Sequence, residues 1–416
     1  MLSVAEASER ILADIRRLDG EEVALRDSLG RVLASDIISP VTLPAWDNSA
    51  MDGYAVHGDD VRGATADGPV SLPIVETIAA GAFASQPLPR GSAMRIMTGA
   101  PLPEGCDTVI RQEDTDGGIE RVAVRDARDV GKNIRRRGED IRAGVLVLAA
   151  GTPLGAAQLG VLSSVGASRV TVSRQPRVAF LGSGDELVDV DGFAEVLAGR
   201  KIVSSNSYTL DALIRLAGGV PVNLGVARDD PADLRTRLDA GLGADLLITT
   251  AGISVGEFDY VRSVLAELGA DLRFWKVRMR PGAPIGFGLL RGVPWLGLPG
   301  NPVSTMVTFD LFVRPVIRRM LGHARPFRRP VPVVLEEAIS IGAPLTHFLR
   351  AIVTPRPDGR LTARLTGSQG SGILTSMALA NALLVVPLER KRYESGESLN
   401  ALLLGEDAYL AEHFEL

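Results

Sequence analysis

The sequence contains a single cysteine, Cys106, among 416 residues. One cysteine cannot form an intramolecular disulfide, and its isolation excludes sites in which several cysteines hold zinc or an iron–sulfur cluster. The four histidines, at positions 57, 323, 347 and 413, lie far apart in the sequence, which argues against a histidine-rich metal site. Any metal should therefore be a hard cation held by oxygen atoms, such as Mg²⁺.

Long apolar runs are also lacking. No stretch of roughly 18 apolar residues is present, so we expect no membrane span. The first 18 residues have neither a long apolar core nor a small-residue cleavage site, so we expect no signal peptide and a cytoplasmic protein. The formal net charge of −5 argues against a general nucleic-acid binder. A small anionic ligand stays compatible with it, because a cleft can be basic inside an acidic protein.

At roughly 150 residues per domain, the length favours about three domains or more. Ser3 and Glu6 form a capping-box pattern before a helical segment, and a region rich in Gly, Pro, Asp and Thr follows. These shifts predict a multidomain α/β fold. Its expected parts are a discontinuous helical and β domain (1–39 and 141–173), a β-rich domain (40–140), an α/β domain (174–324) and a C-terminal β domain (330–416).

The clearest pattern begins near residue 175. Apolar strand-like runs at 177–181, 220–226 and 245–250 alternate with helical segments at 207–216 and 232–242, and a long helix is expected at 303–321. Asn206 is in a position to cap the first of these helices. Strands alternating with helices predict a central, doubly wound parallel sheet.

Four polar loops follow strands of this predicted sheet, at residues 182–186, 228–230, 251–259 and 299–301. Ligands of open α/β sheets bind beyond the carboxyl ends of the strands, so these loops should converge. In the third loop, Gly252 and Gly256 allow close approach of a ligand, and Asp259 opens the next helix, where free N–H groups favour phosphate. A glycine-rich connection with a capping Asp is the simpler interpretation. The string GISVG also imitates a hydrolase nucleophile elbow, but no histidine within this domain could serve as the base.

Other candidates carry simpler alternatives too. Glu186 could bind a metal or lie in a solvated turn, and an Asp before Pro231 is commonly a helix N-cap. Alternation places Lys276, Arg278 and Arg280 on one face of a strand, which suits an oxyanion. Asp52, the loop at 97–101 and the charged run at 135–140 lie outside the α/β region.

Taken together, these strings resemble the molybdopterin molybdenumtransferase (MoeA) family, which includes the E domain of gephyrin. The matching pieces, spread over nearly the whole chain, are WDNSAMDGYAV, IMTGAPLPEGCDTVI, NIRRRGEDI, SGDELV, ISVGEFDY, RPGAPIGFG, LPGNPVS, FLRA and GSGILTSMALANALLVVP. The resemblance implies a four-domain homodimer whose active site is shared between subunits. It also implies Mg²⁺-dependent insertion of molybdate into adenylylated molybdopterin with release of AMP, an upstream adenylyltransferase and a downstream molybdoenzyme.

Residue roles are carried over position by position from this resemblance. The implied catalytic and metal-binding acids are Asp52, Asp140, Glu186, Asp229 and Asp259. Residues implied to contact the nucleotide, pterin or oxyanion are Thr98, Gly99, Ser183, Gly184, Asp185, Asn206, Gly252, Ser254, Gly256, Lys276, Arg280, Pro299, Gly300, Asn301, Ser304, Arg350, Ser371 and Ser376.

Four positions depart from the family pattern: Ala251 replaces a usual Gly, Ser183 a usual Thr, Arg280 a usual Lys with the charge kept, and Ala283 a second usual Lys. The loss of one cation at Ala283 leaves the choice between molybdate and tungstate open. Two other functions stay as alternatives, an adenylyltransferase acting on molybdopterin and a non-catalytic pterin-binding scaffold. A scaffold has no need of five carboxylates, and the additional β domains favour the transferase.

Overall fold

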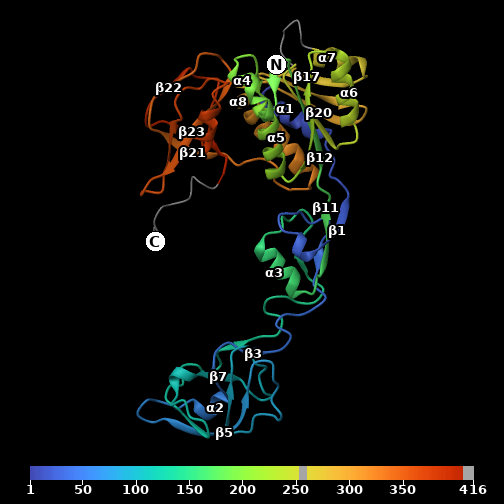
Figure 1. Cartoon of the computed structure of the whole chain (residues 1–416). Helices are drawn as coiled ribbons and strands as arrows, with labels where there is room; N and C mark the ends of the chain where they lie inside the picture. Colours follow the sequence, from blue (N-terminus) through green and yellow to red (C-terminus); the bar gives the residue numbers. More distant parts are fainter. Residues whose placement is uncertain (253–259, 406–416) are drawn as a thin grey trace. The chain divides into compact units, whose positions relative to one another are not determined.

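A computed structural model describes residues 1–252 and 260–405 of the chain. They form two compact units: Met1–Ala34, Gly151–Gly155 and Arg169–Leu416 make up the first, and Ser35–Ala150 with Ala156–Ser168 the second. Figure 1 traces the chain through both. The four-domain division expected from the sequence remains a prediction. Among the described residues, no helix is long and apolar enough to cross a membrane.

The second unit is built mainly of short strands. Its largest sheet has five strands in the order β7-β4-β6-β5-β8, and small pairs join β3 to β9 and β10 to β2. Apolar side chains on both faces of β4, among them Tyr54 and Ala55, are fully buried. The elements of this unit are β2 (Ile37–Ile38), β3 (Asn48–Ser49), β4 (Gly53–Val56), α2 (Gly58–Val61), β5 (Val70–Ile78), β6 (Ala93–Ile96), β7 (Thr108–Arg111), η2 (Gln112–Asp114), β8 (Arg121–Val124), β9 (Ile134–Arg135), β10 (Leu146–Leu148) and α3 (Ala156–Ser164).

The first unit begins with a capped helix, α1 (Val4–Ala13). Ser3 Oγ accepts the backbone N–H of Glu6 while the Glu6 carboxylate accepts that of Ser3, so the predicted capping box is confirmed. Beyond α1 come β1 (Gly20–Ala24), η1 (Leu25–Asp27) and β11 (Arg169–Ser173), with β1 and β11 paired antiparallel.

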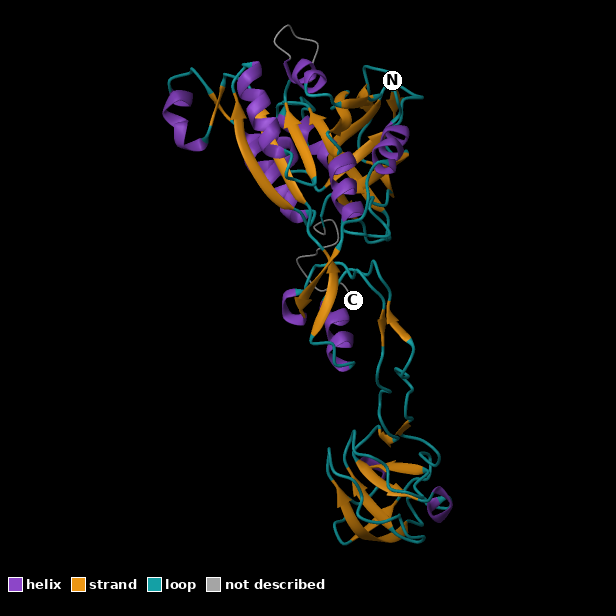
Figure 2. Ribbon diagram, turned by 90° about the vertical axis from the view of Figure 1, so that its right-hand side faces the viewer, coloured by secondary structure: helices purple, strands orange, loops and turns teal. Residues whose placement is uncertain are grey.

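A six-stranded sheet in the order β15-β12-β16-β20-β19-β17 dominates this unit, with helices on both faces (Figure 2). The first four strands are parallel, which confirms the predicted fold class. β19 pairs antiparallel with both β20 and β17, so β19 alone runs against the other five strands and makes the sheet mixed. The strands are β12 (Arg177–Ser183), β15 (Val220–Ala227), β16 (Leu246–Thr250), β17 (Asp271–Lys276), β19 (Pro284–Leu290) and β20 (Val293–Leu298).

Alternate residues of β12 feed two different cores. Val178 and Phe180 pack in the core that also contains residues of α5, α8 and α9, whereas Ala179 and Leu181 pack with residues of α6 and α7. A strand buried on both faces reads as a continuous apolar run, which is the pattern that made it predictable. The helices of this region are α4 (Phe193–Leu197), α5 (Ser205–Leu216), α6 (Pro231–Gly241), α7 (Tyr260–Glu267), α8 (Pro302–Thr308) and α9 (Arg314–Met320), with short η3 (Val190–Gly192), β13 (Leu187–Val188) and β14 (Ile202–Val203) between β12 and α5.

Two local expectations need correction. α5 begins at Ser205, so Asn206 lies inside its first turn and is not the N-cap; its amide instead donates to the Gly300 carbonyl. The long helix expected at 303–321 contains a π-helical segment, η4 (Phe309–Val313), between α8 and α9. Asp230 is the N-cap of α6, where its carboxylate accepts the N–H groups of Ala232 and Asp233.

The C-terminal strands form a closed sheet. Its order is β18-β23-β24-β21-β27-β25, and an additional pairing of β23 with β25 closes a five-stranded ring. Leu349 and Ala351 of β23 belong to the ring's own core, whereas Phe348 belongs to the α/β core, so β23 is buried on both sides. The elements are β18 (Met279–Arg280), β21 (Val331–Leu335), β22 (Ile339–Ser340), β23 (Thr346–Pro355), β24 (Leu361–Leu365), α10 (Leu374–Ala378), β25 (Ala382–Val386), β26 (Arg392–Tyr393) and β27 (Ser398–Leu403).

His323, just beyond α9, gives a testable pH effect. It is 8% exposed, and burial, reinforced by Arg318 and Arg314, lowers the pKa of its imidazole from 6.5 to about 4. Below pH 6.5 the unfolded chain therefore binds a proton that the folded chain refuses. The stability that this group confers is complete above that pH, and up to about 3 kcal/mol is lost as the pH falls toward 4.

We expect the melting temperature of the wild-type protein to fall more steeply between pH 7 and pH 4.5 than that of a His323→Gln variant. Scanning calorimetry of both proteins across this range measures the difference in slope. Parallel slopes would contradict the assignment, because every other titrating group is shared by the two proteins.

Candidate functional site

The four polar loops predicted from the sequence leave neighbouring strands of the parallel part of the sheet. β12 is the first strand of this sheet along the chain, and the next strand in sequence, β15, lies on one side of it while β16 lies on the other. The chain therefore reverses its winding direction at β12, and such a switch point opens a crevice at the carboxyl ends of the strands. Ser183 ends β12 and Thr250 ends β16, so both lie at this edge.

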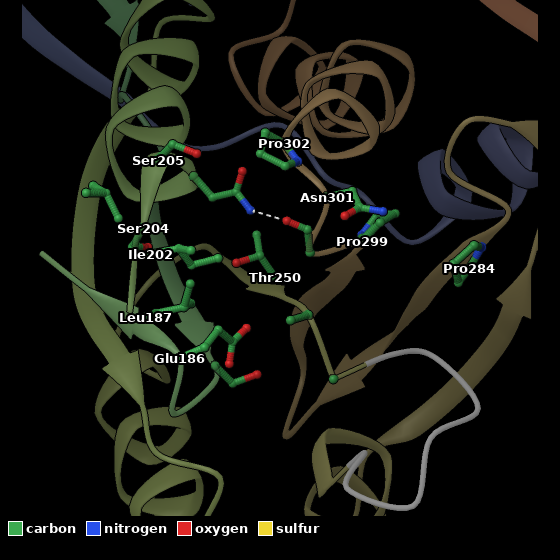
Figure 3. Close-up of a pocket in the computed structure, with 16 residues that line it drawn as sticks. Glu186, Leu187, Ile202, Ser204, Ser205, Thr250, Pro284, Pro299, Asn301 and Pro302 are labelled. Atoms are coloured by element: carbon green, nitrogen blue, oxygen red, sulfur yellow. Dashed lines mark hydrogen bonds between the residues drawn. The ribbon is translucent and has the colours of Figure 1, made fainter. Parts of the chain in front are cut away.

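A cavity of about 380 Å³ occupies the crevice, and Figure 3 shows its lining. Ser183, Glu186, Gly252 and the turn at residues 299–301 all contribute to it, together with the first turn of α5. The dashed line in Figure 3 is the bond from Asn206 Nδ2 to the Gly300 carbonyl, 2.8 Å long. Asn206 Oδ1 is buried and has no hydrogen-bond partner among the described residues, so the cavity wall keeps an acceptor that they leave unsatisfied.

A smaller cavity of about 160 Å³ adjoins the first, and Ser183, Glu186, Ala251 and Gly252 line both. Asp229 lines only the smaller one. The backbone N–H of Asp185 donates to Asp229 Oδ2 (3.3 Å), and that of Asp229 donates to Asp185 Oδ1 (3.2 Å), which ties the two loops together. Gly184, with φ of +140°, lets the first loop turn: a Cβ atom there would meet Glu186 Oε2 at 2.4 Å.

Two consecutive residues after β16 have a left-handed backbone. Ala251 has φ of 67°, in the left-handed region that glycine favours, so the residue that departs from the family pattern also has a strained conformation. Gly252 has φ of 68°, and a Cβ atom there would lie 2.2 Å from Val261 Cγ2. Strained backbone at a ligand crevice is typical of functional loops.

A third cavity, of about 490 Å³, is lined by Arg280, His347, Arg350, Gln369 and Ser371 among others. Arg350 in β23 is fully buried. Its Nε donates to Ser376 Oγ (3.0 Å) and its Nη2 to the Gly370 carbonyl (2.9 Å), whereas its buried Nη1 has no partner in the part of the chain that the structure describes. Gln369 pins the Arg350 backbone, accepting its N–H and donating to its carbonyl.

Burial lowers the pKa of Arg350, yet a guanidinium stays protonated at neutral pH. A buried cation with an unused N–H group is costly unless an anion or water completes its shell. The third cavity therefore has the chemistry of an oxyanion site, and we call it the Arg350 cavity.

The crevice and the Arg350 cavity are linked directly. Asn301 lines the crevice, and its Nδ2 donates to Ser371 Oγ of the Arg350 cavity at 3.0 Å. The segment from Arg280 to Pro284 also connects them, since Arg280 lines the second and Pro284 the first. Ser304, one turn into α8, is 4% exposed, and Ser376 is 3% exposed beside Arg350. A ligand with separate groups could occupy both spaces.

Several predicted residues lie elsewhere. Lys276 is exposed at the end of β17 and lines none of the three cavities. Asp52, Thr98, Gly99 and Asp140 belong to the second unit. Both the N–H and the hydroxyl of Thr98 donate to Asp52 Oδ1 at 2.7 Å, which lowers the pKa of that carboxyl. Three further predicted residues lie outside the described part of the chain: Ser254, Gly256 and Asp259.

Some lining residues escaped the sequence analysis. Thr250 and Ser204 line the crevice, and the only signal for them was a hydroxyl residue at the end of a strand and before a helix. Gln369 and His347 line the Arg350 cavity, and nothing in the local pattern marked them. His347 reaches the cavity because β23 pairs with its neighbouring strands, and Gln369 because the loop after β24 packs back against Arg350. Spacing in the sequence does not predict either contact.

The donor set in the smaller cavity suits a hard cation. Within the described residues, no group of three or more His, Cys, Asp or Glu side chains is placed to hold a metal ion. Glu186 and Asp229 nevertheless line one cavity beside the Ser183 hydroxyl. Mg²⁺ is commonly bound through one or two carboxylates plus water and substrate phosphates, so these residues fit that ion with a phosphorylated substrate.

The α/β sheet has a ligand crevice at its switch point and a cationic cavity beside it. Residues 179–319, which contain nearly all of this sheet, match the family model of a probable molybdopterin binding domain. Residues 2–166 match the MoeA N-terminal region (domain I and II), and residues 332–404 match the MoeA C-terminal region (domain IV). The chain belongs to the MoeA family.

Relatives cover nearly the whole chain. The molybdopterin molybdenumtransferase of Nostoc sp. (strain PCC 7120) is 38% identical over 97% of this chain and 94% of its own length. Molybdopterin molybdenumtransferase 2 of Mycobacterium tuberculosis (strain H37Rv) is also 38% identical, over 96% of this chain and 98% of its own. The crystal structure of the molybdopterin biosynthesis MoeA protein from Pyrococcus horikoshii shares 29% identity with a TM-score of 0.83, covering 97% of this chain and 100% of that one.

Proposed function

We propose that this protein is a molybdopterin molybdenumtransferase of molybdenum cofactor biosynthesis, inserting molybdate into adenylylated molybdopterin with release of AMP. The observation that carries the proposal is the pairing of two linked spaces: a crevice at the sheet's switch point and a cavity holding the unsatisfied Nη1 of Arg350. The first suits a nucleotide-bearing pterin and the second a tetrahedral oxyanion. Family membership over the full length favours this activity over adenylylation of molybdopterin.

The residues divide the work as follows. Ser183, Asn206 and the turn at 299–301 would hold the nucleotide and pterin in the crevice. Arg350, supported by Arg280 and the hydroxyls of Ser371 and Ser376, would receive the oxyanion. Arg280 retains a cation where Ala283 lacks one, which suits a tetrahedral oxyanion of either metal. Molybdate is the proposed substrate, and tungstate is the competitor to test.

Glu186 and Asp229, with Asp259 of the adjoining loop, would hold Mg²⁺. When bound, the ion neutralises the charge of the phosphoanhydride as that bond is cleaved. The protein's own contribution is to hold the Asp229 carboxylate in place, because its Oδ2 accepts the backbone N–H of Asp185.

We further propose a cytoplasmic homodimer whose active site is shared, with Asp52 and Asp140 supplied by the partner's copy of the second unit. Support comes from the family resemblance and from the firmly held Asp52 carboxylate. An upstream adenylyltransferase would deliver the substrate, and a molybdoenzyme would receive the product. Sedimentation equilibrium tests the dimer, with a single-chain mass contradicting it.

The activity is tested by supplying adenylylated molybdopterin, Mg²⁺ and molybdate to the purified protein and measuring AMP. AMP release that depends on molybdate is expected. A parallel reaction with ATP and molybdopterin should yield no pyrophosphate. Pyrophosphate formation would favour the adenylyltransferase, and pterin binding with neither product would favour a scaffold. An Asp259→Ala variant should lose AMP release, and unchanged release would count against the site.

Glu186→Gln gives a sharper prediction because Glu186 lines both cavities at the switch point. Replacing a carboxylate that holds Mg²⁺ should lower kcat for AMP release by roughly 10²-fold and raise the Mg²⁺ concentration needed for half-maximal rate. Magnesium titrations of the rate measure both effects.

The matched control is Glu195→Gln. Glu195 is a partly exposed acid of α4 whose ion-pair partner is Arg200 (2.8 Å), and it is not among the described residues that line either cavity. Its replacement should leave both parameters unchanged. Equal rates for the two variants would remove Glu186 from the metal site.

A further inference from the structure

A cavity away from the candidate site combines apolar walls with arginine. About 390 Å³ in volume, it lies between the last turn of α5, the helix running from α8 through η4 to the start of α9, and the chain around α10 and just beyond β27. Leu213, Leu216, Met306 and Phe309 form much of the wall, and Arg314 and Arg328 line it as well. We call it the Arg314 cavity.

This cavity is separate from the three described above, with which it shares no lining residue. α5 contacts both regions: its start, at Asn206, lines the crevice, and its end, at Leu216, lines the Arg314 cavity. Ten residues of α-helix separate these positions by about 15 Å. A ligand in one cavity would therefore not occupy the other.

The charges around the Arg314 cavity are not balanced. Arg328 is neutralised by Asp310, whose two carboxylate oxygens accept its Nε at 2.9 and 3.0 Å. Arg314 has no such partner among the described residues: its one hydrogen bond there runs from Nη1 to the Pro326 carbonyl at 3.4 Å, and no ion pair joins it to a carboxylate. Burial lowers the pKa of Arg314 to about 10, so the group stays charged at neutral pH.

A second cation lies one helical turn further on. Arg318 Nη2 meets His323 Nδ1 at 3.2 Å, and its buried Nε has no partner within residues 1–252 and 260–405. Since His323 is neutral above about pH 4, it adds no charge of either sign near pH 7. Arg314 lines the cavity and Arg318 does not. The one carboxylate among the described lining residues, Asp310, is already paired with Arg328.

Apolar walls around an uncompensated cation define a ligand class. Small-molecule sites are concave and mostly apolar, with a few polar groups that orient the ligand, and typically measure roughly 300–1,000 Å³. The two methionines of the wall, Met306 and Met377, adapt to ligands of different shape. We propose that the Arg314 cavity binds a small amphipathic carboxylate, with its carboxylate on Arg314 and its aliphatic chain against Phe309 and the methionines.

Octanoate, below its micellar concentration, is the probe, titrated into the full-length protein by calorimetry. We expect saturable binding of one octanoate per chain. Octanol has the same chain without the charge and should bind about tenfold more weakly or worse, because a hydrogen bond to a charged group is worth roughly 1.5–3 kcal/mol. Acetate has the charge without the chain and should show no saturable binding.

Two variants locate the site. Ala380→Trp, which fills the wall of the cavity, should abolish octanoate binding, whereas Ala266→Trp on the exposed face of α7 should not change it. Arg314→Gln should weaken octanoate binding about tenfold while leaving octanol unaffected. Equal affinities for octanoate and octanol, or undiminished binding to Ala380→Trp, would overturn the proposal. The alcohol comparison uses the wild-type protein, so it decides even if Arg314→Gln does not fold.

The outcome is independent of the proposed transferase activity. An Arg350→Met variant, altered in the other cationic cavity, should bind octanoate with wild-type affinity. Loss of octanoate binding in that variant would place the ligand in the Arg350 cavity and refute the assignment to Arg314.

Discussion

Arg350→Met should reduce kcat/KM for molybdate by roughly 10²- to 10³-fold, the range seen when one preorganised donor to an oxyanion is removed. The reason is the unshared Nη1 group, which no other described side chain satisfies. Arg350→Lys keeps the charge but cannot reproduce the bonds to Ser376 and Gly370, so it should retain part of the activity with a raised KM. Initial rates of AMP release across molybdate concentrations measure both parameters.

Folding must be controlled, since Arg350 also holds the loop at 368–370. Arg364→Met, an exposed arginine on the neighbouring strand β24, is the matched variant and should keep wild-type rates. Molybdate binding measured by calorimetry supplies a readout that does not depend on turnover. A folded Arg350→Met protein that binds molybdate as tightly as the wild type would exclude Arg350 from the oxyanion site.

Gly282→Ala should be the most damaging small substitution in the linking segment. Gly282 has φ of +100°, and a Cβ atom would lie 2.4 Å from Thr308 Cγ2. Thr308 is fully buried, and its hydroxyl donates to the Ser304 carbonyl at 2.7 Å, so its methyl group has little freedom to move away. We expect the free energy of unfolding to fall by about 3–5 kcal/mol, because the substitution adds both left-handed backbone strain and overpacking.

Gly292→Ala separates the two causes. Gly292 has φ of +86°, but nothing lies within 4 Å of its hypothetical Cβ atom. Gly292→Ala should therefore lower the free energy of unfolding only by the cost of the left-handed backbone, about 1–2 kcal/mol. Melting temperatures of both variants and of the wild type give the comparison. Equal melting temperatures for the two variants would show that the helix containing Thr308 yields to the new methyl group. Because Arg280 is two residues from Gly282, Gly282→Ala should also raise KM for molybdate.

Much of the α/β fold could be predicted because its signals are local. The strand predicted at 245–250 is β16, Leu246–Thr250, and all of its residues are buried. The apolar run in the sequence predicts both the strand and its burial. The local sequence pattern does not indicate that β19 runs antiparallel to β20. It pairs with β20 through a turn at Arg291 and Gly292, both with positive φ. Such hairpin turns usually contain Asn-Gly or Asp-Gly, and an arginine in the first position conceals the signal.

The candidate site was predictable in a different way. Convergence of the strand-end loops follows from topology, so Glu186 and Asp229 could be expected near one another before any coordinates were known. The role of Asn206 could not. Its position before an apolar helical pattern suggests an N-cap, whereas its amide reaches Gly300, 94 residues later. Likewise, the burial of Arg350 depends on β23 lying between two cores, which the string FLRA does not encode.

The π-helical segment between α8 and α9 determines the directions in which the side chains of α9 point relative to those of α8. Each residue of an α-helix advances the direction of its side chain by about 100°, so a turn widened by one residue rotates everything after it. Before η4, Ser304 lies one turn into the helix that opens at the crevice; after it, Val316, Ile317 and Met320 are buried in the core that also holds residues of α1. Deleting one residue from Phe309–Val313 would keep a helix but turn one half away from its partners. The half that begins at the crevice and the half that packs against α1 therefore cannot change length independently.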